Sequence, residues 1–113
     1  MTTPDDVPQV DPAGAGTLAA GGALLLDVRE PAEWAAGHIP GAVHVPLGSL
    51  DPAALPAARV VVAVCRSGNR SGKAAAALAD AGLDVRNLAG GMKAWAGAGR
   101  DVVRDDGSPG TVA

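Results

Sequence analysis

The only cysteine of the chain, Cys65, follows a β-branched run and precedes a short loop of small and basic residues. The loop, residues 66–71, reads Arg-Ser-Gly-Asn-Arg-Ser. Its backbone N–H groups can converge on one point at the start of a helix, and its arginines add positive charge, so both favour a thiolate over a thiol. A buried structural cysteine is the alternative, but such a cysteine does not require these polar neighbours. The pattern therefore predicts a reactive thiolate.

The segments on either side of the loop are predicted to hold Cys65 in place. Residues 60–64 are apolar and mostly β-branched, which is typical of a buried strand, and residues 73–81 are strong helix formers. Gly82 is suited to end that helix in the left-handed conformation. Cys65 is thus expected at a turn from a strand to a helix.

The rest of the chain shows the same alternation of strands and helices. We expect strands at 7–10, 23–28, 42–45 and 85–88, and helices at 12–20, 31–36, 49–55 and 92–96. This order predicts the α/β class, with a parallel or mostly parallel sheet and helices on both of its faces. Sites in such folds lie beyond the carboxyl ends of strands, which is where Cys65 is expected.

Composition limits the class of protein and its partners. The 113 residues fit one domain, and the absence of Phe and Tyr means that Ala, Val and Leu must fill the core. A net charge of -3 without a basic stripe argues against nucleic acid as a partner. No segment reaches the length of a membrane helix, and the acidic start lacks the features of a secretion signal, so a cytoplasmic location is expected. A single cysteine agrees with a reducing compartment.

Domain boundaries follow from local composition. Residues 1–6 are acidic and polar and are expected to be flexible, and residues 7–104 carry the alternating elements of the domain. Residues 105–113 are rich in turn formers, which predicts a disordered tail.

Four short motifs in order resemble those of single-domain rhodaneses. They are Asp27 to Glu30 followed by Glu33-Trp34, then Gly37 to Ala42, the Cys65 loop, and Gly90 to Trp95. The resemblance covers about residues 7–103. It implies a five-stranded, mostly parallel sheet wrapped by helices. It also implies transfer of a sulfane sulfur through a persulfide on Cys65, from a donor such as thiosulfate to cyanide or another thiol.

Loop length separates this chemistry from its nearest alternative. Arg70 comes five positions after Cys65, with four residues between them. Phosphatases and arsenate reductases that resemble this fold have five residues there, which opens a cradle for a tetrahedral anion. The shorter loop leaves space for a sulfur carrying one further sulfur atom, so sulfur transfer is favoured.

The loop residues are expected to have distinct roles. Cys65 is the nucleophile, and N–H groups from Arg66 to Ser71 are expected to stabilise both the thiolate and the persulfide. Arg66 would steer an anionic donor, whereas Arg70 would close the loop through backbone or carboxylate contacts. The Ser71 hydroxyl either caps the helix or donates to the sulfur, and capping is its commoner use. We therefore assign Cys65 to catalysis and Arg66, Ser67, Gly68, Asn69, Arg70 and Ser71 to substrate binding.

Other polar residues receive structural interpretations. The carboxylates near Asp27 are expected to form ion pairs or brace loops, because sulfur transfer needs no pair of acid and base. His38 and His44 are too few and too poorly spaced for a zinc site, and His38 is expected to bond the backbone. Trp34 and Trp95 are expected to be packing residues rather than a ligand cage. No cofactor and no metal are expected.

With one cysteine, no second thiol can resolve an adduct inside the chain. The sulfur must leave to another molecule, such as a small thiol, cyanide, or a thioredoxin-like or other sulfur-accepting protein. Two alternatives remain from a different class: a persulfide carrier that serves one partner, and a non-catalytic interaction module. The latter often lacks the cysteine.

Overall fold

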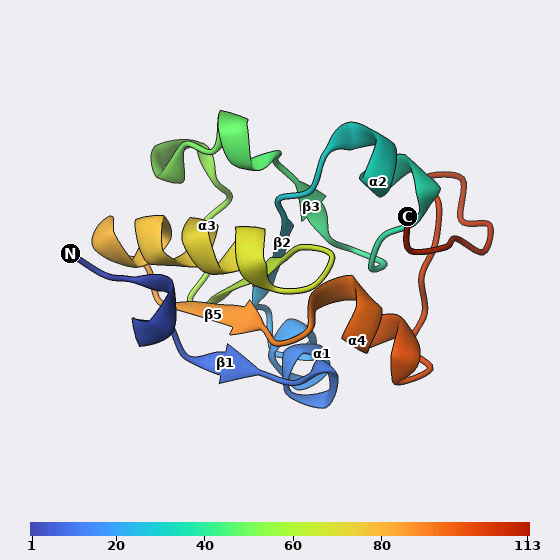
Figure 1. Cartoon of the computed structure of the whole chain (residues 1–113), viewed down its shortest axis with the longest axis horizontal. Helices are drawn as coiled ribbons and strands as arrows, with labels where there is room; N and C mark the ends of the chain where they lie inside the picture. The colour runs from blue at the N-terminus through green and yellow to red at the C-terminus, as the bar shows by residue number, and fades with distance from the viewer.

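The computed structural model describes all residues, 1–113, and contains one five-stranded sheet with helices around it (Figure 1). The spatial order of the strands is β1-β5-β4-β2-β3, and every neighbouring pair is parallel. The predicted α/β class is confirmed. The strands are β1 (Gln9–Val10), β2 (Leu24–Asp27), β3 (Val43–His44), β4 (Val61–Val64) and β5 (Val85–Leu88); the helices are α1 (Pro12–Ala20), α2 (Pro31–Ala36), α3 (Asn69–Asp80) and α4 (Gly91–Gly97).

The central strands are apolar because both faces of the sheet are covered. All four residues of β4 are buried, and β2 pairs with it from Leu24 opposite Val61 to Asp27 opposite Val64. Parallel pairing brings the carboxyl ends of β2, β4 and β5 to one edge of the sheet. Cys65 lies at that edge, directly after β4.

Two aliphatic cores lie on opposite faces of the sheet. The alternation of side chains along β4 sends Val61 and Ala63 to the face covered by α3, and Val62 and Val64 to the face covered by α1 and α4. Alanines of α3 pack closely on the first face, and Trp95 of α4 fills space on the second. The predicted coverage of both faces is therefore confirmed, as is the packing role of Trp95.

The predicted helix over residues 49–55 is wrong. Two separate 3-10 turns, η2 (Leu47–Ser49) and η3 (Pro52–Ala54), occupy this region. Pro52 falls inside the predicted helix, where it lacks an N–H to donate and its ring collides with the preceding turn. It is instead tolerated at the first position of η3, which Asp51 caps through the N–H of Ala53 at 3.1 Å.

Both ends of the chain form hydrogen bonds with the rest of the domain. Pro4–Asp6 forms a 3-10 turn, η1, and Thr2 N donates to Asp80 of α3 at 2.6 Å. Residues 105–113 lie beside the C-terminal end of α2. Thr111 N donates to Ala36 O at 2.9 Å, and Gly110 N donates to Val102 O at 2.8 Å. Turn-forming residues let this segment reverse direction and satisfy its backbone against α2, which composition alone does not reveal.

None of the helices combines the length and the apolar character needed to cross a bilayer.

Candidate functional site

The loop after Cys65 is shorter than the sequence indicates because α3 begins at Asn69, four residues before the predicted start. Only Arg66, Ser67 and Gly68 lie between Cys65, which follows β4 directly, and the helix. Gly68 is the N-cap with φ of 108°, a left-handed conformation that favours glycine. The first turn of α3 therefore carries Asn69, Arg70 and Ser71, and its N–H groups face the loop.

The start of α4 holds the other side of the loop. Met92 N donates to Cys65 O at 2.8 Å, and Lys93 N donates to Arg66 O at 3.0 Å. A Cβ on Gly91 would collide with the carbonyl oxygens of Cys65 and Arg66, so the backbones approach this closely only with glycine. The Gly90-Gly91 turn thus fixes the backbone on which the thiol is carried.

The thiol of Cys65 is buried and surrounded by donors. The residue is 1% exposed, and its Sγ lies 3.0 Å from Gly68 N and 3.3 Å from Ser71 Oγ. Burial raises the pKa of the thiol, but the Ser71 hydroxyl and the N–H groups of Ser71, Gly68 and Ser67 outweigh it and hold the pKa below its usual value. The geometry therefore favours a thiolate in a fixed position.

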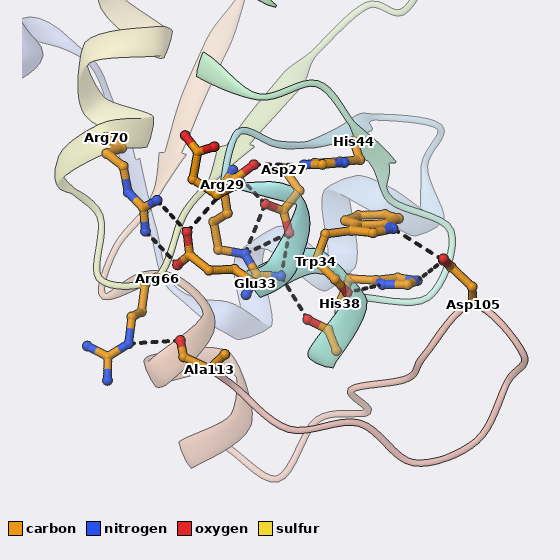
Figure 2. Close-up of polar contacts among 12 residues, drawn as sticks. Asp27, Arg29, Glu33, Trp34, His38, His44, Arg66, Arg70, Asp105 and Ala113 are labelled. Atoms are coloured by element: carbon orange, nitrogen blue, oxygen red, sulfur yellow. Dashed lines mark hydrogen bonds and ion pairs between the residues drawn. The ribbon is translucent and has the colours of Figure 1, made fainter. Parts of the chain in front are cut away.

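Arg70 points toward Glu33 and closes the loop on α2 (Figure 2). Its guanidinium forms a bidentate pair with Glu33, with Nη1 to Oε1 at 2.6 Å and Nη2 to Oε2 at 2.8 Å. The hydrogen bonds from Arg70 lower the pKa of Glu33 to about 2, and Glu33 raises the pKa of Arg70. The predicted carboxylate contact of Arg70 is confirmed.

Beneath this pair lies a buried ion pair between Asp27 and Arg29. Arg29 is fully buried, and its Nη2 donates to Asp27 Oδ2 and to Gly37 O, both at 2.8 Å. Its Nη1 has no hydrogen-bond partner. The pair links the end of β2 to the end of α2 through Gly37, which confirms the structural interpretation of these two residues.

Arg66 lies on the outer side of the loop and is exposed. Its Nε donates to Ala113 O at 3.1 Å, and its terminal nitrogens form no hydrogen bond within the protein (Figure 2). Ser67 and Asn69 line a polar cavity of about 280 Å³ beside the loop, together with Gly68, Asn87 and Gly90. The loop therefore presents one cation and several polar groups outward.

Sequence reasoning missed Asn87, a buried polar residue of β5. Its Oδ1 accepts from Ser71 Oγ at 2.5 Å, and its Nδ2 donates to Gly68 O at 3.1 Å and to Gln9 Oε1 at 2.9 Å. The signal available in the sequence is an asparagine inside a predicted strand, where asparagine is disfavoured. Ser71 does not cap the helix, because Gly68 occupies that position.

The two histidines lie away from the thiol. The Trp34 ring lies between them (Figure 2), with ring centroids 3.6 Å from His38 and 4.9 Å from His44. His38 Nδ1 bonds Trp34 O at 3.0 Å, as predicted, and His44 Nε2 donates to Arg29 O at 2.7 Å. No group of three or more His, Cys, Asp or Glu side chains is placed to hold a metal ion.

The fold and the site together are those of a parallel α/β domain that carries a buried cysteine in a tight loop at the carboxyl edge of its sheet. The model of the rhodanese-like domain matches residues 15–98. The chain belongs to the rhodanese-like family.

Individual proteins agree with this assignment. The chain is 44% identical over 87 residues to a sulfurtransferase of Allochromatium vinosum, covering 74% of this chain and 81% of that protein. It is 42% identical over 89 residues to an uncharacterized protein of Synechocystis, covering 76% of this chain but only 50% of that protein. The crystal structure of a rhodanese-related protein from Thermoplasma volcanium superposes with a TM-score of 0.77 at 28% identity, covering 85% and 97% of the two chains.

Proposed function

We propose that this protein is a sulfurtransferase that carries sulfane sulfur as a persulfide on Cys65. The observation that supports this most strongly is the environment of Sγ, which has Gly68 N at 3.0 Å and Ser71 Oγ at 3.3 Å in a site with no second cysteine. Such a cradle stabilises an anionic sulfur without supplying a general acid or a metal.

The proposed reaction consists of two successive nucleophilic displacements at sulfur. The Cys65 thiolate attacks the outer sulfur of thiosulfate, so that an Sγ–S bond forms while the S–S bond of the donor breaks and its electron pair leaves with sulfite. The outer sulfur of the persulfide then carries the negative charge. Cyanide or a thiolate attacks that sulfur, and the electron pair of the Sγ–S bond returns to Cys65 as a thiolate.

Arg66 is suited to attract an anionic donor. It is the exposed cation of the loop, and its terminal nitrogens have no partner within the protein. A guanidinium with free terminal nitrogens binds sulfonate-like oxygens well. We therefore assign donor binding to Arg66 and to the N–H groups of the loop from Ser67 to Ser71.

Phosphate chemistry is the weaker candidate on this geometry. Both terminal nitrogens of Arg70 are held by Glu33, at 2.6 and 2.8 Å, so this guanidinium is not free to bind a tetrahedral anion over Sγ. The four residues between Cys65 and Arg70 support the same conclusion.

Intact mass spectrometry after incubation with thiosulfate tests the proposal directly. We expect wild-type protein to gain one sulfur atom and Cys65→Ser to gain none, and we expect cyanide to restore the original mass. Finding the unmodified mass for wild type across thiosulfate and other sulfane sulfur donors would contradict the proposal.

Steady-state assays separate the enzyme from its alternatives. Turnover of thiosulfate and cyanide by wild type but not by Cys65→Ser supports a catalyst. A persulfide that forms without turnover indicates a carrier for one protein partner, and no persulfide indicates an interaction module. Hydrolysis of an aryl phosphate that depends on Cys65 would favour the phosphatase instead.

A further inference from the structure

The hydroxyl of Ser71 has more acceptors than it has protons. Its Oγ lies 2.5 Å from Asn87 Oδ1, 3.3 Å from Cys65 Sγ and 3.3 Å from Gly68 O. A hydroxyl carries a single proton and donates one hydrogen bond at a time. All three side chains are buried, with Ser71 0%, Cys65 1% and Asn87 5% exposed, so water does not readily replace a missing partner.

Asn87 cannot relieve this competition by turning its amide around. Its Nδ2 donates to the backbone carbonyl of Gly68 at 3.1 Å, and a reversed amide would place Oδ1 against that carbonyl oxygen. A second bond, from Nδ2 to Gln9 Oε1 at 2.9 Å, favours the same orientation. Asn87 Oδ1 therefore faces Ser71 as a fixed acceptor.

We propose that Asn87 is a positioning residue for the reactive sulfur: it competes with Cys65 for the Ser71 proton and takes that proton whenever Sγ is uncharged. This inference rests on the proposed function only for the sulfur-loaded state, since the competition exists in the unloaded protein.

The proton has a different preferred partner in each state of the sulfur. With Cys65 as a thiol, the S–H donates to Ser71 Oγ and the hydroxyl donates to Asn87. With Cys65 as a thiolate, the hydroxyl turns to Sγ, because a bond to a charged acceptor is the stronger one. In the persulfide the charge lies on the outer sulfur, Sγ becomes a weak acceptor, and the hydroxyl returns to Asn87. Asn87 thus stabilises the loaded state relative to the resting thiolate.

Replacing Asn87 tests the direction of this effect. In Asn87→Leu the Ser71 proton is always available to Sγ, so we expect the pKa of Cys65, measured by the ultraviolet absorbance of the thiolate, to fall by about half to one unit. The same substitution in a Ser71→Ala background is expected to shift the pKa by less than about 0.2 unit, because no proton is left to share. The charged groups around the loop, Arg66, Arg70 and Glu33, are present in every variant, so their effect on the pKa of Cys65 cancels in the comparison.

Gln9→Ala is the matched control. It removes the other side-chain partner of Asn87 from an exposed position while Oδ1 still faces Ser71, and we expect the pKa of Cys65 to stay at its wild-type value. A pKa that rises or does not move in Asn87→Leu, or that shifts equally in both backgrounds, would overturn the proposal and leave Asn87 as a support for the loop.

A measurement on wild-type protein decides the question even if Asn87→Leu fails to fold. The ¹³Cγ chemical shift of Asn87 is expected to titrate with the pKa of Cys65 and to become insensitive to pH in Ser71→Ala. An insensitive wild-type shift would contradict the proposal.

After loading with thiosulfate, the ¹³Cγ chemical shift of Asn87 is expected to return to its low-pH value. If the mass shows no added sulfur while the shift still titrates, the proposed function fails and the positioning role of Asn87 stands.

Discussion

At the scale of single residues, the reactivity of Cys65 depends on a few short-range donors more than on full charges. Gly68 N and Ser71 Oγ approach Sγ directly, whereas both terminal nitrogens of Arg70 bind Glu33. The pKa of the thiol is lowered from its usual value although burial raises it, because these donors outweigh the cost of desolvation. The terminal nitrogens of Arg66 have no partner within the protein, which agrees with the donor-binding role that we propose for it.

Ser71→Ala is expected to raise the pKa of Cys65 by about one unit, because a hydrogen bond to a charged acceptor is lost. At a pH below that pKa the thiolate fraction, and with it the rate of persulfide formation, should fall about tenfold. Ultraviolet titration of the thiolate and the pH dependence of turnover measure both effects. Ser49→Ala, at an exposed position, serves as the control, and an unchanged pKa in Ser71→Ala would contradict the assignment.

At the scale of elements, two helices clamp the loop from different sides. α2 holds it through the Glu33–Arg70 pair, and the start of α4 holds it through backbone bonds to the carbonyls of Cys65 and Arg66. Neither helix contributes a group to the sulfur itself. Their effect is to keep three loop residues in one conformation.

Glu33→Gln is expected to destabilise the protein by about 1–2 kcal/mol at neutral pH, a figure reduced for partial solvent exposure of the pair. Because the pKa of Glu33 falls from 4.5 to about 2 on folding, its contribution is complete above pH 4.5 and is lost as the pH falls toward 2. Urea unfolding of both proteins from pH 7 to pH 2 should show the difference disappearing over that range. Glu30→Gln, one turn earlier and exposed, should show a smaller loss at neutral pH, and equal losses would contradict the clamp.

Gly91→Ala and Gly97→Ala are a matched pair within α4. At Gly91 the added Cβ meets the carbonyls of Cys65 and Arg66 at a φ of 57°, so we expect a loss of about 3 kcal/mol or more and a disturbed thiol pKa. At Gly97 the added Cβ meets nothing within 4 Å, so stability should stay level or rise by up to about 1 kcal/mol. Thermal unfolding compares them, and similar melting temperatures would contradict the close approach at Gly91.

The candidate site could be predicted from the sequence only where its residues are neighbours along the chain. The loop sequence indicates Cys65 and its N–H groups, because a strand followed by a helix places them together. The partners Glu33 and Asn87 are 37 residues from Arg70 and 16 residues from Ser71, respectively. Local patterns, turns and periodicities carry no information about such pairs, since the order of strands in the sheet decides which side chains meet.

At the scale of the whole molecule, the sheet is covered on both faces by small aliphatic side chains. Their packing holds together the carboxyl edge of the sheet, where Cys65 lies. Leu26 lies in the middle of β2, is fully buried, and packs in the same core as the alanines of α3. On the outside of the molecule, residues 105–113 contact the end of α2 and also Arg66 of the Cys65 loop.

Leu26→Ala is expected to cost about 3–4 kcal/mol, because the closely packed core cannot collapse into the space that the side chain leaves. For a domain of this size that is a large part of the total stability. Leu83→Ala, at a partly buried position on the margin of the same core, should cost clearly less. Denaturant unfolding measures both, and equal losses would contradict the placement of Leu26 at the centre.

The sequence by itself determined the α/β class, the family and the place of Cys65 between a strand and a helix, because these depend on local periodicity and on motifs of adjacent residues. Tertiary structure alone decided that Arg70 binds Glu33, that Asn87 shares the proton of Ser71, and that the tail folds along α2. Each of these contacts joins segments far apart in the chain, and only the parallel pairing of the strands brings their side chains to the same edge of the sheet.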